Sequence, residues 1–539
     1  MWHAHCVAPQ GGFDRGVQDV LLDGLALTLE RRPDAPLYRQ IYQGLAAEIV
    51  GGAIRPGQRL PSTRDLAQAL GVSRNTIMLA FEQLAAEGYL EGLSGSGTYV
   101  SREPPAEVVE PGAPRINPAI RAAGSLDRSL DLAVDLDAAL GIDPDADLGG
   151  ALAHAPQTLR HMRRPVPFRS NFPALDAFPV QLWAKLAADL YRKLDADTAN
   201  HLMGEGDPQG YAPLREAIAE HVSLGRGIDC TAGNVIIFAG AQQAVDLACR
   251  LLLMPGDKVV CEDPGYDGIY ASAIATGAVP VPVPVDTDGL DIEEALRRAP
   301  DGRMIYVTPS KQFPLGMALS LERRHRLVDW ANRSGGWIVE DDYDSEFRYS
   351  GRPLPSLYGM DRGGRVIYLG TFSKTLFPAL RLGFAIVPEP LVEAFVSART
   401  VVGRYSPILE QVLVARFMKE GHFASHVRKM RKLYAQRQEY LLDAVARRLG
   451  ACMTARPTDT GMEIVAELAP GISARALAKA AAREGLEIMP LSLLARSGEV
   501  DVDDRITLGF SPFTARQIDE AVETLRRVAE NLPRAPIAS

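Results

Sequence analysis

From about residue 166 to residue 535, short apolar segments alternate with helical patterns. The apolar segments are residues 234–240, 258–263, 304–309, 337–342, 365–370 and 383–388. They are rich in Val and Ile and mostly lack polar–apolar alternation, as expected of strands that are buried on both faces of a parallel sheet. Helical patterns such as 241–253 and 320–335 lie between several of them. This order predicts an α/β fold with a mainly parallel sheet.

A chain of 539 residues is expected to form more than one domain, because a single core rarely grows beyond ~250–300 residues. We predict a compact region at 30–101, a linker at 102–165 and a large domain at 166–535. The linker is rich in Pro and Ala and then in Asp, so it cannot bury enough apolar surface to fold alone, although 125–140 could form a short helix. The last ~130 residues have the pattern of a smaller α+β domain.

Composition limits the compartment and the kinds of site. The five cysteines form no CxxC pair, which favours buried thiols in a reducing compartment over disulfides or a zinc site, so we expect no metal. The first 16 residues lack a basic-then-apolar signal, and no stretch of ~18 apolar residues occurs. We therefore expect a cytoplasmic protein with no membrane partner. The net charge of -9 would not by itself suggest a nucleic-acid binder.

Residues 37–100 nevertheless have the pattern of a helix-turn-helix. A first helix is predicted at 37–50, with Ile41, Leu45 and Ile49 on one apolar stripe. A second helix should follow Ser62 and end at Gly71, and a third should follow Ser73 and end at about residue 87. Two short helices joined by a tight turn can place the start of the second in the major groove of DNA. That start contributes Ser73, Arg74, Asn75 and Thr76.

The segment 89–100 predicts two short strands around a Gly-rich tip, which is a wing. A small helical hairpin packed on another element is the alternative for the helices alone. The complete string, GAIRPGQRLPSTRDLA (52–67), VSRNT (72–76) and GSGTYV (95–100), resembles the winged helix-turn-helix domain of the GntR family. The resemblance implies that double-stranded operator DNA is a partner. It implies a contact set of Ser62, Arg64, Ser73, Arg74, Asn75, Thr76, Gly95 and Gly97.

The charge of this module is nearly balanced. Residues 31–100 contain seven arginines, no lysine and six acidic residues. We expect DNA affinity to depend on a few focused arginines and on a second copy of the module.

A second group of motifs points to a cofactor. Lys374 lies in GTFSKTLFPALRLG (370–383), directly after a predicted strand. A lysine among hydroxyl groups can condense with an aldehyde, and Arg381 can bind a phosphate. The strand WIVEDDYDSEFRY (337–349) presents Asp341 and Tyr343 on one side. A carboxylate can keep a pyridine nitrogen protonated, and a phenol can hydrogen-bond a ring hydroxyl. Taken singly, a solvated lysine and a solvated acidic cluster are the alternatives.

Two more segments complete the pattern. FAGAQQA (238–244) joins a strand to a helix N-terminus, where free N–H groups bind phosphate. EDPGY (262–266) places Tyr266 where it could stack on a planar ring. The set resembles fold-type I, pyridoxal-phosphate-dependent proteins of the aminotransferase class, over residues 166–535.

The resemblance implies pyridoxal 5'-phosphate as the cofactor and assigns a role to each residue. Lys374 would carry the internal aldimine, Asp341 would pair with the ring nitrogen, Tyr343 would pair with the ring hydroxyl, and Tyr266 would stack. The residues expected around the phosphate are Ala241, Gln242, Thr371, Ser373 and Arg381.

A winged helix joined through a long linker to such a domain resembles the MocR subfamily of GntR regulators. GEGDPQGYAPLR (204–215) and TPSKQFPLG (308–316) are further stretches typical of it. Glu205, however, stands where a tyrosine usually reaches the phosphate of the neighbouring subunit. Phe313 lies in a segment that replaces Asn-Pro-Gly, and Lys311 stands where the subfamily often has His.

A carboxylate receptor is expected on a late strand. Arg505, in DDRITLGFS (503–511), is the candidate, although the subfamily often places this arginine closer to L-G-F. A surface arginine on an edge strand is the alternative.

The MocR resemblance implies a transcriptional regulator that senses a small amine, an amino acid or pyridoxal phosphate itself. It also implies a homodimer, domain-swapped head-to-tail, in which each DNA module crosses to the partner's large domain. Even 60 flexible residues have an r.m.s. reach of ~40 Å, enough for such a crossing. A working aminotransferase that carries a DNA module is the alternative, so enzyme activity stays open. Glu205 and Phe313 favour sensing.

Overall fold

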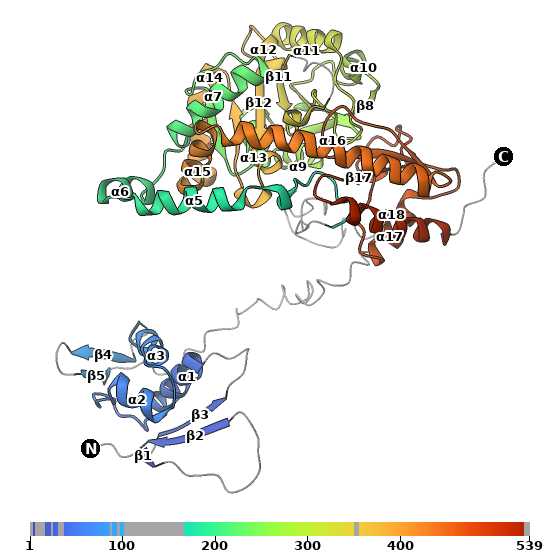
Figure 1. Cartoon of the computed structure of the whole chain (residues 1–539). Helices are drawn as coiled ribbons and strands as arrows, with labels where there is room; N and C mark the ends of the chain where they lie inside the picture. The colour runs from blue at the N-terminus through green and yellow to red at the C-terminus, as the bar shows by residue number, and fades with distance from the viewer. Residues whose placement is uncertain are drawn as a thin grey trace. The chain divides into compact units, whose positions relative to one another are not determined.

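The computed structural model describes residues 4–5, 17–22, 25–30, 37–86, 89–93, 97–101, 166–349 and 355–532. The chain divides into two compact units at Arg128 and Ser129. Figure 1 draws the first in blue and the second from green to red. The predicted linker at 102–165 and Gly95 lie outside the described residues. Within the described part of the chain, no helix is long and apolar enough to cross a membrane.

The first unit contains the predicted helix-turn-helix and wing. Its helices are α1 (Leu37–Val50), α2 (Thr63–Ala69) and α3 (Arg74–Ala86), and its wing strands are β4 (Leu90–Leu93) and β5 (Gly97–Val100). The predicted bounds of the first helix are confirmed. Ile41, Leu45 and Ile49 are buried in the core that holds the three helices together. The strands β4 and β5 pair antiparallel, as a wing requires.

Three further strands precede the helices. They are β1 (Ala4–His5), β2 (Val17–Leu22) and β3 (Leu25–Glu30), and they form an antiparallel sheet in the order β1-β2-β3. These strands were not predicted, and the predicted domain began at residue 30. The signal was present, because Asp-Gly at 23–24 separates β2 from β3, and a two-residue Asp-Gly spacing is typical of a β-hairpin.

The second unit is built on an eight-stranded sheet in the order β6-β13-β12-β11-β10-β7-β8-β9. Its strands are β6 (Val235–Phe238), β7 (Lys258–Asp263), β8 (Val279–Asp286), β9 (Gly289–Leu290), β10 (Met304–Val307), β11 (Trp337–Asp341), β12 (Val366–Thr371) and β13 (Gly383–Ile386). All six predicted strands are present. The sheet is mainly parallel, but β13 runs antiparallel to both of its neighbours.

Helices on both faces explain why these strands lack alternation. In β6, Val235 and Ile237 pack into one core, whereas Ile236 and Phe238 pack into another. Successive side chains of a strand point to opposite faces, so a strand covered on both sides is apolar throughout. The helices of this part are α7 (Ala212–Arg226), α8 (Ala241–Leu252), α9 (Asp267–Ala275), α10 (Ile292–Arg298), α11 (Leu321–Ser334), α12 (Leu357–Met360), α13 (Phe372–Thr375), α14 (Glu389–Gly403) and α15 (Ile408–Lys419).

Strand β8 was not predicted because its sequence, VPVPVPVD, carries a proline at every second position. Proline lacks the N–H group that a central strand needs. Here the pairing with β7 is parallel, and the backbone N–H of Val279 donates toward that side, to the carbonyl of Asp257 at 2.8 Å. Successive residues of a strand point their backbone N–H groups in opposite directions. The valines therefore donate toward β7, and the backbone nitrogens of the prolines point away from β7, where no ladder hydrogen bond to β7 is lost. The strand is therefore compatible with its position near the sheet edge.

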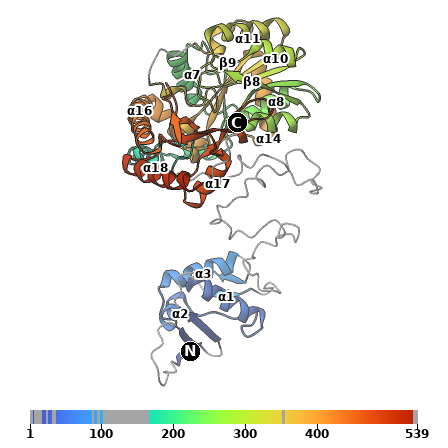
Figure 2. The same cartoon turned by 90° about the vertical axis from the view of Figure 1, so that its right-hand side faces the viewer.

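A smaller α+β part completes the second unit, as predicted. Its sheet has the order β14-β15-β17-β16, with β14 (Met453–Ala455), β15 (Glu463–Leu468), β16 (Met489–Pro490) and β17 (Arg505–Gly509). Its helices are α16 (His422–Leu449), α17 (Ala474–Arg483) and α18 (Ala515–Glu530), and α5 (Val180–Arg192) and α6 (Ala196–Met203) precede α7. Figure 2 shows α16, α17 and α18 together at one side of this unit.

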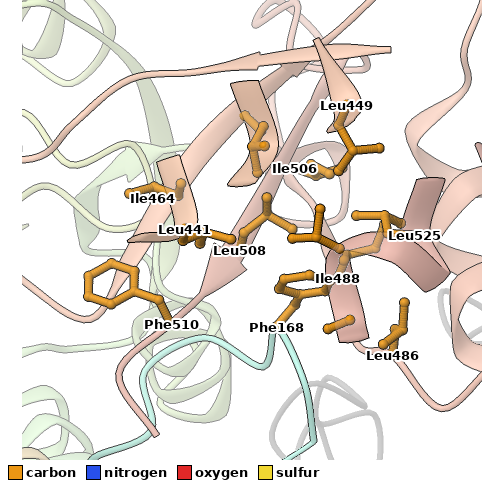
Figure 3. Packing of buried hydrophobic residues seen from close by; sticks show 14 of the residues in the cluster. Phe168, Leu441, Leu449, Ile464, Leu486, Ile488, Ile506, Leu508, Phe510 and Leu525 are labelled. Carbon is orange, nitrogen blue, oxygen red and sulfur yellow. The ribbon is translucent and has the colours of Figure 1, made fainter. Parts of the chain in front are cut away.

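One face of the small sheet is the core of this part. Ile464 on β15 and Ile506 and Leu508 on β17 pack with residues of the helices (Figure 3). The opposite face carries Glu463 and Thr507, because side chains alternate along each strand and paired residues share a face. Both side chains are nevertheless buried. This second face contributes to the site described next.

Candidate functional site

The predicted cofactor residues follow strands that run in the same direction. The strands β7, β10, β11 and β12 are parallel, so their carboxyl ends meet at one edge of the sheet. Tyr266, Lys311, Tyr343 and Lys374 lie within a few residues of those ends. Ligands of open α/β sheets bind outside the carboxyl ends of the strands. The topology therefore brings residues from four separate motifs to one edge.

Asp341 is the buried carboxylate at this edge. The hydroxyl of Tyr306 donates to its Oδ2 at 2.5 Å, while its Oδ1 is buried without a hydrogen-bond partner. Burial raises the pKa of Asp341 to about 6, and the charge of Lys374 acts in the opposite direction. The carboxylate is thus held by one hydrogen bond and keeps one buried acceptor atom for another group.

Tyr343, two residues after Asp341, also has a buried oxygen atom without a hydrogen-bond partner. Its hydroxyl is buried and has no hydrogen-bond partner, and burial raises its pKa. The ring of Phe313 contacts the ring of Tyr343 edge-on at 6.1 Å and the ring of Tyr266 at 6.4 Å. Phe313, which departs from the family pattern, therefore lies between two of the predicted cofactor residues.

Lys374 lies on α13, and Thr371 caps that helix by accepting from the backbone N–H of Ser373 at 3.1 Å. The Nζ of Lys374 donates to the backbone carbonyl of Asn171 at 2.7 Å. Asn171 has a left-handed backbone, with φ of 59°. Asn171 was not predicted to be a site residue, because it lies 203 residues from Lys374 and belongs to no motif with an assigned chemistry.

The start of α8 forms the other end of the site. Its N-cap is Gly240, with φ of 95° and no side-chain cap, so the first N–H groups of the helix are available to an anion. A Cβ on Gly240 would lie 3.5 Å from Nη1 of Arg381, whose Nη2 donates to the carbonyl of Ala239 at 2.8 Å. Gly240, which directly precedes the predicted phosphate residues Ala241 and Gln242, is therefore adjacent to Arg381.

Gln242, in the first turn of α8, connects the phosphate end of the site to Tyr266. Its Oε1 accepts from the hydroxyl of Tyr266 at 2.8 Å, and its Nε2 donates to Ser272 at 3.0 Å. The ring of Tyr266 stacks against that of Tyr306 at 6.3 Å. Since Tyr306 binds Asp341, the aromatic and acidic residues are linked by direct contacts.

These residues fit pyridoxal phosphate. The cofactor has a basic ring nitrogen, a ring hydroxyl, an aldehyde and a phosphate. The buried Oδ1 of Asp341 is an acceptor for a protonated ring nitrogen, and the hydroxyl of Tyr343 is a partner for the ring hydroxyl. The N-terminus of α8 with Arg381 suits the phosphate, and Lys374 supplies an amine.

A buried cluster of charges lies beside this site. The Nζ of Lys311 contacts Oε1 of Glu463 at 2.6 Å and Oδ2 of Asp344 at 3.1 Å, and all three side chains are almost fully buried. Burial raises the pKa of Asp344 to about 7, although Lys311 opposes that change. Oε2 of Glu463 accepts from the backbone N–H of Asn171 at 2.9 Å. The cluster therefore connects the small sheet to the residue that holds Lys374.

Two residues of the sequence analysis lie in exposed ion pairs. Glu205 pairs with Arg404 at 2.9 Å, and both side chains are exposed. Arg505 is 38% exposed, and its Nε lies 3.8 Å from Asp504. The described residues contain no group of three side chains arranged to hold a metal ion.

In the first unit, six of the predicted DNA residues lie at the starts of α2 and α3. Ser62 caps α2 by accepting from the N–H of Asp65 at 3.2 Å, and Ser73 caps α3 by accepting from the N–H of Thr76 at 3.1 Å. The residues Arg64, Arg74 and Asn75 are exposed, and Thr76 is half-buried. The Nε of Arg74 donates to Thr63 at 3.3 Å, which links the two helices.

Gly97 begins the second wing strand with φ of 119°. A Cβ there would lie 2.8 Å from Nε of Arg59, an exposed arginine outside the predicted contact set. Arg59 also pairs with Tyr99 in an isolated β-bridge, so the wing is bound to the loop before α2.

Comparison with known proteins agrees with both units. Residues 37–100 match the bacterial regulatory proteins of the gntR family, and residues 164–525 match aminotransferase class I and II. "Probable rhizopine catabolism regulatory protein MocR" of Rhizobium meliloti is 38% identical over 500 residues, which cover 93% of this chain and 95% of that protein. The chain belongs to the MocR subfamily of GntR regulators.

A second regulator and a solved aminotransferase are also similar. The transcriptional regulator TauR of Rhodobacter capsulatus is 34% identical over 76% of this chain and 79% of its own. The α-aminoadipate aminotransferase LysN of Thermus thermophilus has a TM-score of 0.64 at 28% identity, over 71% of this chain and 97% of its own. The predicted fold, a GntR helix-turn-helix followed by a fold-type I domain, is confirmed.

Proposed function

We propose that this MocR-type chain is a transcriptional regulator that binds operator DNA through its winged helix and senses a small amine, an amino acid or pyridoxal phosphate at Lys374. Pyridoxal 5'-phosphate is the cofactor of its aminotransferase-like domain. The observation that carries the proposal is the pair of buried, unpartnered atoms beside Lys374, Oδ1 of Asp341 and the hydroxyl of Tyr343. They lie in the same chain as a helix-turn-helix with exposed Arg74 and Asn75.

When bound, the cofactor supplies an aldehyde that takes up a primary amine reversibly. Asp341 would hold the proton of the ring nitrogen, because its Oδ1 is a buried acceptor. The N–H groups at the start of α8 and Arg381 would bind the phosphate. Lys374 would exchange with an incoming amine, and the carbonyl of Asn171 would hold its released Nζ, the contact that it makes here at 2.7 Å.

The contacts that join Lys374 to the small sheet support the proposal that this domain is a sensor. Asn171 contacts Lys374 through its carbonyl and Glu463 through its N–H. A change at Lys374 would therefore alter a contact of β15, and the position of the smaller part could shift with it. We further propose a cytoplasmic homodimer, domain-swapped head-to-tail, with the DNA-binding domain at 30–101, a linker at 102–165 and the effector domain at 166–535.

A catalytically active aminotransferase that carries a DNA module is the second candidate. Lys374, Asp341 and Tyr343 favour it, because they are the residues that the chemistry requires. Glu205 and Phe313 favour the sensor. Glu205 is engaged with Arg404, and a carboxylate would repel a phosphate.

The test uses the full-length protein loaded with pyridoxal phosphate and DNA from its own promoter region. We expect amines to change the visible absorbance of the bound cofactor and the affinity for DNA. Lys374→Ala should lose both responses, whereas Lys185→Ala, which changes an exposed lysine on α5, should keep them. If no amine, amino acid or free cofactor changed either signal, the sensor would be excluded. Steady multiple turnover with a keto acid would instead establish the enzyme.

A further inference from the structure

The wall of the site beside Lys374 is formed by the segment 169–171 and the buried second face of the small sheet. Asn171 holds Lys374 through its carbonyl, and its N–H donates to Glu463. The neighbouring Ser170 shares a hydrogen bond with Thr507, with 2.7 Å between the two hydroxyl oxygens. An amine that reaches Lys374 would therefore lie next to Asn171, which Ser170 and Glu463 join to Thr507 and the small sheet.

The positive charges of this wall are already engaged. Lys311 lies between two buried carboxylates, those of Glu463 and Asp344. Arg169, the residue before Ser170, forms an ion pair with Glu487. The cluster of Lys311, Glu463 and Asp344 contains two acidic groups for one base. A further carboxylate brought to this wall would be desolvated beside acidic groups, which is unfavourable.

The side chain of Arg505 is 38% exposed and lies near Asp504. It shares a sheet face with Thr507, but the contact with the site is at the other end of β17, where Gly509 pairs with Glu463. Arg505 and Gly509 are four positions apart, which corresponds to about 13 Å along a strand. Thr507 stands between them, paired with Val465. The position on β17 that faces Ser170 therefore carries a neutral hydroxyl group.

Asn171 contributes an unpartnered acceptor atom to the wall, which suits a hydrogen-bond donor. The Oδ1 of Asn171 has no partner, and this residue is only 9% exposed. An amide oxygen accepts hydrogen bonds and repels a carboxylate. Two hydroxyl groups that share one hydrogen bond keep a second hydrogen and several lone pairs, so Ser170 and Thr507 can exchange hydrogen bonds with a hydroxyl group of a ligand.

We propose that the effector of this site is a hydroxyl-bearing primary amine without a carboxylate, such as an amino alcohol, and that Asn171 with the Ser170–Thr507 pair selects it. The inference rests on the proposed function, since it assumes that an amine reaches Lys374. It narrows the effector from amines and amino acids in general to one chemical class.

The test compares matched ligands on the full-length protein loaded with pyridoxal phosphate. The pairs are L-serine with 2-aminoethanol and L-threonine with 1-aminopropan-2-ol, which differ only by the carboxylate. Dissociation constants come from the visible absorbance and, independently, from the melting temperature. We expect each amino alcohol to bind at least tenfold more tightly than its amino acid. Tighter binding of the amino acids would overturn the inference and leave amine sensing intact. No response to any of the four would count against both.

Substitutions at the wall give a second test. Thr507→Arg adds a cation, so the preference should shift toward the amino acids by about tenfold or more. Asn171→Gly keeps the left-handed backbone and should weaken 2-aminoethanol more than propylamine, which lacks the hydroxyl. Arg516→Ala, at an exposed position on α18, is the control. If Arg505→Ala abolished binding of serine, Arg505 would be the carboxylate receptor and the inference would be wrong.

Discussion

Asp341 shows how burial prepares a single residue for a ligand. Its Oδ2 is held by Tyr306, its Oδ1 has no partner, and burial raises its pKa to about 6. An unpartnered buried acceptor costs free energy in the protein alone and is compensated when a donor binds. The same holds for the hydroxyl of Tyr343. The sequence predicted both residues, but their unpartnered state is visible only in the structure.

A substitution of Arg74 tests the predicted DNA-binding surface. Arg74 is the first residue of α3, its side chain is exposed, and an arginine at this place can bind a base edge. We expect Arg74→Ala to weaken operator binding by about 1–3 kcal/mol, roughly five- to 150-fold. Fluorescence anisotropy with labelled promoter DNA measures the change. Arg55→Ala, an exposed arginine outside the predicted contact set, should change affinity much less. Equal losses in the two variants would contradict the assignment.

The lowered pKa of His426 leads us to expect that the free energy of unfolding depends on pH. This histidine is buried on α16 against the rings of Phe178 and Phe417, and burial lowers its pKa to about 4. The unfolded histidine binds a proton below about pH 6.5, whereas the folded one resists until about pH 4. Stability is therefore complete above pH 6.5 and is lost as the pH falls toward 4.

The lowering of the His426 pKa corresponds to a loss of at most about 3 kcal/mol in the free energy of unfolding. Urea unfolding at several pH values should show a smaller loss between pH 6.5 and 4.5 in His426→Gln than in the wild type. His325, which is exposed on α11, gives the control variant His325→Gln, which should keep the wild-type slope. Parallel curves for the wild type and His426→Gln would disprove the role of this histidine.

At the scale of elements, β13 and α8 form the phosphate end by close approach. A Cβ on Gly383 would lie 2.9 Å from the backbone nitrogen of Ala241, closer than real Cβ atoms come. Gly383→Ala should push the start of α8 away, cost about 1–3 kcal/mol of unfolding free energy and weaken binding of pyridoxal phosphate. Gly225→Ala, in α7 with open space around it, should leave both quantities unchanged or slightly improved. Equilibrium unfolding and cofactor titration measure them.

Elements with local patterns were predictable, and elements that depend on their neighbours were not. The helix at 37–50 and the six buried strands followed from period and composition. Strand β8 was missed because its prolines are tolerated only when their backbone nitrogens point away from β7. The first hairpin was missed although Asp-Gly at 23–24 indicated it.

At the scale of the whole molecule, the two units should respond differently to the cofactor. A ligand that binds only the folded effector domain stabilises it by about 2.7 kcal/mol at a concentration of 100 Kd. In calorimetry of the full chain, pyridoxal phosphate should raise the melting temperature of the transition of the second unit and leave that of the first in place. Lys374→Ala should reduce the shift. A common shift of both transitions would mean that the units unfold together.

The sequence by itself determined the two kinds of unit, the order of the strands along the chain and the residues of each short motif. It could do so because turns, caps and strand ends depend on neighbours within a few residues. Only the tertiary structure decided which distant residues complete the site. Asn171 meets Lys374 across 203 residues, and Ser170 meets Thr507 across 337. Contacts of that range arise when packed elements bring separate segments together, and no local pattern records them.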